Sequence, residues 1–161
     1  MSAETLANNI GAVRQGRISQ QEAAQRVVQH FTDRGLRVPG CGSAVHRGGD
    51  PRVPRRFEIA QQGNVLGDFK HLAMEVEKQL SQAKGRALGI NQDGALAALG
   101  LDLKLDWRLI LALASIPRSG GLAMHALEET TRESGWRHVP NAGVVYDGPA
   151  ARPLPPRGGG R

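Results

Sequence analysis

The chain has very little of what stabilises small secreted domains or anchors proteins in membranes. Its 161 residues include a single cysteine, Cys41, which excludes a disulfide within the chain and is typical of a reducing compartment. No apolar run approaches the roughly 20 residues of a membrane span, and the N-terminus lacks the apolar stretch of a secretory signal. We therefore expect a cytoplasmic protein with no membrane partner. Aromatic residues make up only 4%, so the core must be built from aliphatic side chains.

The charge balance is basic, with a net charge of +6 at pH 7, which makes nucleic acid a rival partner. No zinc-finger spacing, RNA-binding aromatic motif or basic heptad array is present, and we predict no metal site. The arginines are concentrated in one stretch, where Asp50 is the sole acidic residue. The arginines of this stretch are Arg34, Arg37, Arg47, Arg52, Arg55 and Arg56.

Apolar periodicity is helical almost throughout, so an all-α fold is predicted. The capping-box spacing of Ser19 and Glu22 opens one helix, and the others are expected over 51–62, 68–83, 94–101, 106–116 and 119–133. The 106–116 segment has little polar surface, which predicts deep burial. A helical domain over residues 19–146 follows an N-terminal segment, 1–18, whose order the pattern leaves open. Residues 147–161 are rich in Pro, Gly and Arg and are expected to form a mobile tail.

The most informative stretch is the glycine-rich basic turn from Gly40 to Arg52. Asp50 and Pro51 are suited to the start of a helix, so Arg52 lies in its first turn. Glycines permit close approach of a ligand to the backbone, while the helix start and the guanidinium groups favour an anion. On composition alone, a solvated loop between helices is the better explanation of the same residues.

Three motifs resemble the citrate synthase superfamily. Gly40-Cys41-Gly42, Arg47 and Asp50-Pro51-Arg52 follow the spacing of its Gly-x-Gly-…-Asp-Pro-Arg motif. Asn91-Gln92-Asp93 is similar to its Asn-Val-Asp motif, and Pro117-Arg118-Ser119-Gly120-Gly121 is similar to its next arginine segment. The ending Tyr146-Asp147-Gly148-Pro149-Ala150 resembles the short citryl-CoA lyase-like branch. The resemblance covers about residues 20–156 and implies the family's C-terminal portion, its small domain plus the returning helices of the large domain.

The resemblance implies roles for individual residues. Asp93 matches the aspartate that takes a proton from the methyl group of acetyl-CoA, or that acts on the enolate in the lyase direction. From the residues alone, Asp93 reads instead as an N-cap of the following helix. Arg52 and Arg118 match the arginines that bind substrate carboxylates, with Arg47 as a further candidate.

The resemblance also implies a coenzyme A thioester as substrate and no tightly bound cofactor. The family's loop for the CoA adenine corresponds to Val38, Pro39, Gly40, Cys41 and Gly42. Lys84 and Arg86 lie near the expected path of the cofactor. The substrates would be acetyl-CoA or citryl-CoA and oxaloacetate, and a homodimer is expected.

Two departures from the family bear on activity. The histidine that polarises the carbonyl under attack is replaced by Ser43, a weaker donor, and His46 is the candidate to replace it. The family's Gly-(x)-His-Gly-Gly-Ala segment, whose histidine stabilises the enolate, is absent from this sequence. An active enzyme would then work as a reduced oligomer or with a separate N-terminal partner chain.

Three functions from different classes fit the sequence. The first is a citryl-CoA lyase or citrate synthase-type enzyme. The second is a noncatalytic CoA-binding or interaction protein that keeps the fold. The third is a basic nucleic-acid-binding protein that reuses the arginines.

Overall fold

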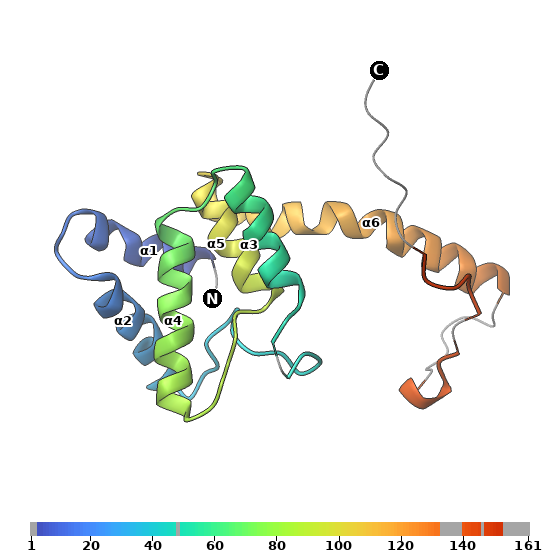
Figure 1. Ribbon diagram of the computed structural model, residues 1–161, viewed down its shortest axis with the longest axis horizontal. Helices are drawn as coiled ribbons and strands as arrows, with labels where there is room; N and C mark the ends of the chain where they lie inside the picture. The colour runs from blue at the N-terminus through green and yellow to red at the C-terminus, as the bar shows by residue number, and fades with distance from the viewer. Residues whose placement is uncertain (1–2, 48, 133–139, 146, 153–161) are drawn as a thin grey trace, which may run out of the picture. The chain divides into compact units, whose positions relative to one another are not determined.

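The computed structural model describes residues 3–47, 49–132, 140–145 and 147–152. In these residues the regular structure is entirely helical, which confirms the all-α prediction (Figure 1). The chain divides into two compact units, Met1–Gly121 and Leu122–Arg161. The helices are α1 (Ala3–Arg14), α2 (Gln20–Thr32), α3 (Arg52–Gln62), α4 (Asp68–Lys84), α5 (Gln92–Asp102), α6 (Trp107–Arg132) and a short 3-10 helix, Asn141–Gly143.

The core of the first unit forms around α4, which packs against α1, α2 and α5. The apolar face that the sequence predicts for α4 is buried, with Leu72 and Val76 at 0% exposure. They meet Val27 of α2 and Leu6 of α1, both of which are also fully buried. Burial of a Leu or Val side chain stabilises a fold by roughly 1.5–3 kcal/mol, so these four residues account for much of the stability of the helical layers.

Local sequence signals set the helix starts. The capping box of α2 is present as predicted, since the Ser19 hydroxyl accepts from the Glu22 N–H and the Glu22 carboxylate accepts from the Ser19 N–H. The cap of α5 is Asn91, whose side-chain oxygen accepts from the backbone N–H groups of Asp93 and Gly94. The interpretation of Asp93 as the N-cap is therefore wrong, because the helix begins at Gln92, two residues earlier than the apolar pattern indicates.

Helix α4 is capped from a distance. Asp102, the last residue of α5, accepts hydrogen bonds from the backbone N–H groups of Gly67, Phe69 and Lys70 at 3.0–3.1 Å. These N–H groups have no partner inside the helix, so one carboxylate satisfies the start of α4 and ties it to the end of α5.

Helix α6 differs from the sequence prediction in two respects. Pro117 and the glycines 120 and 121 predict two helices, yet the structure has one continuous helix with Pro117 inside it. Proline removes one hydrogen bond and crowds the preceding turn, so it weakens this helix without ending it. The predicted deep burial is also wrong, because only Ile110 and Ala114 are buried among the residues of α6.

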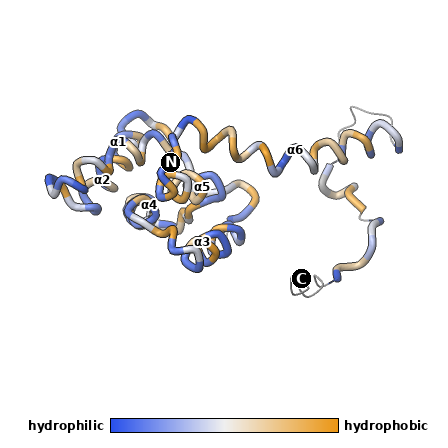
Figure 2. Tube along the Cα trace, turned by 90° about the horizontal axis from the view of Figure 1, so that it is seen from above, coloured by the Kyte–Doolittle hydropathy of each residue, from blue (hydrophilic) through white to orange (hydrophobic). Residues whose placement is uncertain are grey.

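Trp107 is half-buried against the core, but seven large apolar side chains of α6 are exposed, and Figure 2 shows hydrophobic stretches along this helix. They are Leu109, Leu111, Leu113, Ile116, Leu122, Met124 and Leu127. By length and composition α6 is also apolar enough to cross a membrane, contrary to the sequence expectation. That expectation rests on uninterrupted apolar runs, whereas the apolar residues of α6 are interrupted by Arg118. One such helix is weak evidence for a span, since core helices of soluble proteins pass the same test.

In the second unit, Arg132 at the end of α6 forms an ion pair with Asp147 at 2.6 Å. The predicted tail lies partly outside the described residues, which end at residue 152.

Candidate active site

Two segments far apart in sequence pair to build the floor of the site. Cys41 and Ile90 form an isolated antiparallel bridge. On its two sides, Gly42 N–H donates to Gly89 O at 2.8 Å, and Asn91 N–H donates to Gly40 O at 2.9 Å. Gly40 and Gly42 have φ angles of 84° and 76°, which side chains rarely tolerate. The glycine-rich turn thus lies directly beside the start of α5.

Asn91 joins the two segments with its side chain as well. Its Nδ2 group donates to Gly42 O at 2.8 Å while its Oδ1 atom caps α5. The amide is therefore used at both ends, and Asp93, two residues on, is left as an exposed carboxylate in the first turn of the helix. Helix N-termini favour negative charge, so the carboxylate is compatible with this position.

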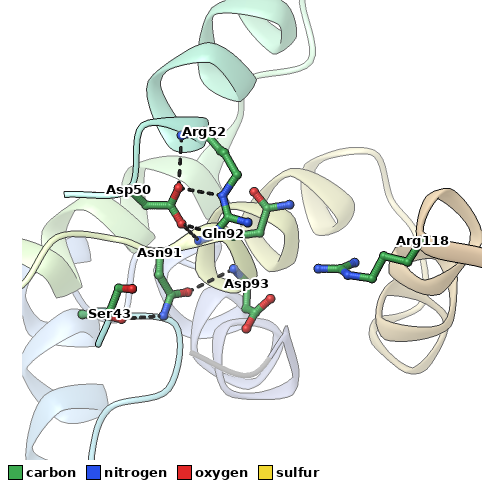
Figure 3. Close-up of a pocket in the computed structure, with 8 residues that line it drawn as sticks. Ser43, Asp50, Arg52, Asn91, Gln92, Asp93 and Arg118 are labelled. Atoms are coloured by element: carbon green, nitrogen blue, oxygen red, sulfur yellow. Dashed lines mark hydrogen bonds and ion pairs between the residues drawn. The ribbon is translucent and has the colours of Figure 1, made fainter. Parts of the chain in front are cut away.

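A pocket of about 270 Å³ opens above this floor. Four of the residues predicted to act in catalysis or to bind substrate carboxylates line it together, and Figure 3 shows them from four different segments of the first unit. They are Ser43 from the turn, Arg52 from α3, Asp93 from α5 and Arg118 from α6. The other lining residues are Gly42, Asp50, Asn91 and Gln92.

Ser43 is held by its own turn. Its Oγ atom accepts from the backbone N–H groups of Val45 and His46, at 3.2 and 3.0 Å. The hydroxyl proton can still be donated, since both bonds use the oxygen as acceptor. His46 contributes its backbone to this turn and is not among the residues that line the pocket.

Arg52 forms a bidentate pair with Asp50, whose side chain is 1% exposed. The Arg52 Nε and Nη2 groups donate to the two Asp50 oxygens at 2.8 and 2.7 Å. The hydrogen bonds from Arg52, with a further one from Gln92 N–H, hold the pKa of Asp50 well below its usual range despite burial. The bond to Asp50 also raises the pKa of Arg52, with a smaller contribution from the charge of Asp93.

Arg118 approaches from α6 and points toward Asp93 in Figure 3. Its Nη1 group donates to the carbonyl oxygen of Ala114, one turn earlier in the helix. Two arginines, Arg52 and Arg118, and two carboxylates, Asp50 and Asp93, therefore line the same pocket. Arg47 is exposed and is not among the lining residues.

The residues predicted to bind CoA lie outside the lining, apart from Gly42. Val38 and Gly40 are buried, Pro39 is exposed, and Cys41 is half-buried. Burial raises the pKa of the Cys41 thiol to about 11. Lys84 ends α4 and Arg86 follows it, both with exposed side chains. Among the residues that the structure describes, no group of three or more His, Cys, Asp or Glu side chains is placed to hold a metal ion.

Two functional residues were missed by the sequence reasoning. Gln92 is buried, and its Oε1 atom accepts from Arg56 Nε at 3.0 Å, across 36 positions of sequence. Asp50 had been assigned to a helix start, whereas its Oδ2 atom also accepts from Gln92 N–H at 3.0 Å. A polar residue between Asn91 and Asp93, where the related motif has valine, was the one available signal.

Comparisons with known proteins identify the family of the chain. The family described as citrate synthase, C-terminal domain, matches residues 6–138. The structure is similar to that of citryl-CoA lyase from Hydrogenobacter thermophilus, with a TM-score of 0.68 and 29% sequence identity. The match covers 96% of this chain and 59% of the lyase, so the chain spans little more than half the length of that relative. No curated protein matches the sequence.

Proposed function

The chain belongs to the citrate synthase family through the family's C-terminal domain, and on that premise we propose that it carries the substrate-binding part of an acyl-CoA enzyme. The reaction is of the citryl-CoA lyase or citrate synthase type, with acetyl-CoA or citryl-CoA and oxaloacetate as substrates. The observation that supports it most directly is the single pocket lined by Arg52, Arg118 and the exposed carboxylate of Asp93.

The two guanidinium groups suit a substrate with several carboxylates. Guanidinium pairs with carboxylate in a planar, bidentate geometry that fixes orientation as well as charge. Arg52 and Arg118 enter the pocket from different helices, so a dicarboxylate bound by both would be held at two points. Asn91 and Gly42, which line the pocket beside them, bring backbone and amide groups to the same space.

Asp93 is the proposed proton carrier. In the synthase direction its carboxylate takes a proton from the methyl group of acetyl-CoA, and the resulting enolate attacks the carbonyl carbon of oxaloacetate. In the lyase direction the hydroxyl of the citryl group gives its proton to water and becomes that carbonyl, while Asp93 starts in its protonated form. The bond between its carbon and the acetyl methylene breaks, and the methylene carbon takes a proton from Asp93. Ser43 donates a hydrogen bond to the oxygen at this centre and keeps its own proton, and in the synthase direction the alkoxide takes its proton from water.

Further chains complete the proposed enzyme. The family resemblance implies an enolate-stabilising histidine that this sequence does not carry, and we propose that a partner chain supplies it. The exposed apolar side chains of α6 between Leu109 and Leu127 suit the interface of a homodimer. The partner chain is proposed from the family resemblance alone. The homodimer is proposed from the resemblance and from the exposed apolar face of α6.

Titration calorimetry with oxaloacetate, CoA and acetyl-CoA, alone and in pairs, tests the binding part of the proposal. We expect oxaloacetate to bind the wild type and to lose affinity with Arg118→Ala, while Arg47→Ala, outside the pocket, serves as the matched control. Oxaloacetate binding that is equal in all three proteins would contradict the assigned pocket.

Turnover is tested by the release of acetyl-CoA from citryl-CoA, with and without a polypeptide carrying the family's histidine segment. Asp93→Asn should keep ligand binding and reduce turnover by about 100-fold or more. Ser43→His, which restores the family residue, should raise turnover by about 100-fold.

A noncatalytic CoA-binding role is the second candidate, because Ser43 is uncharged and His46 does not line the pocket. CoA binding without turnover, in wild type and in Ser43→His alike, would favour it. Salt-sensitive binding of oligonucleotides of any sequence would instead favour the nucleic-acid alternative.

A further inference from the structure

Asp50 is a buried carboxylate that has no role in the proposed reaction steps. Four donors satisfy it: the backbone N–H, Nε and Nη2 groups of Arg52, and the backbone N–H of Gln92. The four distances lie between 2.7 and 3.1 Å. A buried charge is stable only when it is paired and hydrogen-bonded, and this carboxylate meets both conditions.

The bond from the Gln92 N–H joins Asp50 to a residue 42 positions later in the sequence, and it thereby connects the starts of two helices. Arg52 opens α3, and Gln92 opens α5 directly before Asp93. Figure 3 shows the Asp50 carboxylate between the Arg52 side chain and the backbone of residue 92. One carboxylate therefore binds both the guanidinium group of Arg52 and the backbone of the residue directly before the candidate base.

The orientation of Arg52 follows from this contact. The edge formed by Nε and Nη2 faces Asp50. The edge that includes Nη1 is turned away from Asp50, and this second edge of a guanidinium group can form another pair with a carboxylate. The side chain is 53% exposed and lines the pocket, so a ligand carboxylate can reach it.

We propose that Asp50 is a positioning residue. It fixes the position of the Arg52 guanidinium group relative to the start of α5, so that a ligand carboxylate bound to Arg52 places the ligand beside Asp93. This proposal rests on the proposed function. It assigns the specificity of the pocket for carboxylates partly to a side chain that makes no contact with the substrate.

The charge of Asp50 allows a test by the sign of an effect. A negative charge beside an anion site opposes the binding of a second anion, so electrostatics alone predicts tighter binding once that charge is removed. Positioning predicts weaker binding, because a freed Arg52 side chain loses its orientation. The two explanations therefore predict opposite changes in affinity for Asp50→Asn.

The experiment is titration of the full chain with oxaloacetate. We expect Asp50→Asn to raise the Kd by about tenfold or more. Asp106→Asn is the matched control, since Asp106 makes the same type of contact with the arginine two residues on, Arg108, but is exposed and outside the pocket. Asp102→Asn controls for lost stability, because Asp102 bonds only the start of α4 among the contacts described above. An unchanged or lower Kd in Asp50→Asn would overturn the proposal.

A second variant decides the matter if Asp50→Asn does not fold, or if the wild type binds no oxaloacetate. Arg52→Lys keeps the charge but removes the fork that contacts Asp50. The proposal expects the backbone amide resonances of Gln92 and Asp93 to shift in this variant, and those of Asp106 and Arg108 to stay in place. Unchanged resonances at 92 and 93 would overturn the proposal. These shifts in Arg52→Lys, together with a wild type that binds no oxaloacetate, would instead contradict the proposed function alone.

Discussion

The backbone of Gly94, in the first turn of α5, lies so close to the carbonyl oxygen of Gly40 that a Cβ atom at position 94 would overlap it. This contact lets the glycine-rich turn sit against the start of α5. Any side chain at 94 would push apart the two segments that carry Ser43 and Asp93. The relationship is a packing constraint that a single sequence does not reveal, since a glycine inside a helix reads merely as a weak helix former.

Gly94→Ala should therefore destabilise the protein although alanine favours helices. Overpacking of this kind costs about 1–3 kcal/mol in the free energy of unfolding, and urea denaturation measures it. Gly120→Ala is the control, because a Cβ atom there meets nothing within 4 Å. At that site alanine should stabilise by about 0.5–1 kcal/mol. Equal effects of the two substitutions would contradict the packing argument.

Asn91→Asp separates the two uses of the Asn91 amide. Aspartate caps a helix as well as asparagine does, but it cannot donate to Gly42 O. The carbonyl would lose its partner and face a negative charge, so we expect a loss of about 1–3 kcal/mol in the free energy of unfolding. Asn9→Asp is a control, since Asn9 also donates through Nδ2 to a backbone carbonyl but within one helix, α1. Stability that is unchanged in Asn91→Asp would show that the bond to Gly42 is dispensable.

The pH dependence of stability should report Asp50. Its hydrogen bonds to Arg52 hold the pKa of Asp50 below its unfolded value in the folded protein. The stabilisation is therefore fully present above the unfolded pKa, about 3.9, and is lost as the pH falls toward the folded value. Between pH 5 and about 2, the wild type should lose more of its free energy of unfolding than Asp50→Asn does. Parallel curves for the two proteins would rule out this linkage.

Sequence reasoning predicted the helices well where periodicity and caps agreed. The ranges 51–62 and 68–83 differ by only one residue from α3 and α4, because their apolar faces are regular and Gly63 and Gly85 follow them. The N-cap of α5 was placed on Asp93 instead of Asn91, since both residue types cap helices and only the hydrogen bonds distinguish them. Helix α6 was split because local chemistry marks Pro117 as a breaker.

The sequence predicts part of the pocket lining, but neither Gln92, nor the role of Asp50, nor the hydrogen bonds that connect them. The resemblance to the family implies Arg52, Asp93 and Arg118 as site residues, and the structure places all three in the lining of one pocket. Hydrogen bonds join Gln92 to Asp50 and to Arg56, which lie 42 and 36 positions earlier in the sequence. No periodicity or capping rule contains that information, because it arises only when α3 and α5 pack together.

Cys41 should be a poorly reactive thiol. Burial raises its pKa to about 11, and the thiolate is the form that reacts with iodoacetamide. At pH 8 we expect alkylation of the folded protein to be about 100-fold slower than that of the protein unfolded in guanidinium chloride. The chain has no other cysteine, so mass spectrometry of the intact protein follows the reaction directly. Equal rates in the two states would show that the turn from Gly40 to Gly42 opens readily.

The exposed face of α6 gives the last prediction. Leu111 and Ile116 are 78% and 65% exposed, and water-exposed apolar patches of this kind favour association. If they form a homodimer interface, Leu111→Glu and Ile116→Glu should weaken self-association in analytical ultracentrifugation while leaving the thermal midpoint of the monomer nearly unchanged. Ile110→Glu is the opposing control, since Ile110 is 4% exposed and packs where a Cβ atom on Gly100 would lie, so that variant should lose stability. A wild type that sediments as a monomer at high concentration, with no gain in solubility for the glutamate variants, would contradict the interface. Association that persists in both glutamate variants would place the contact on another surface.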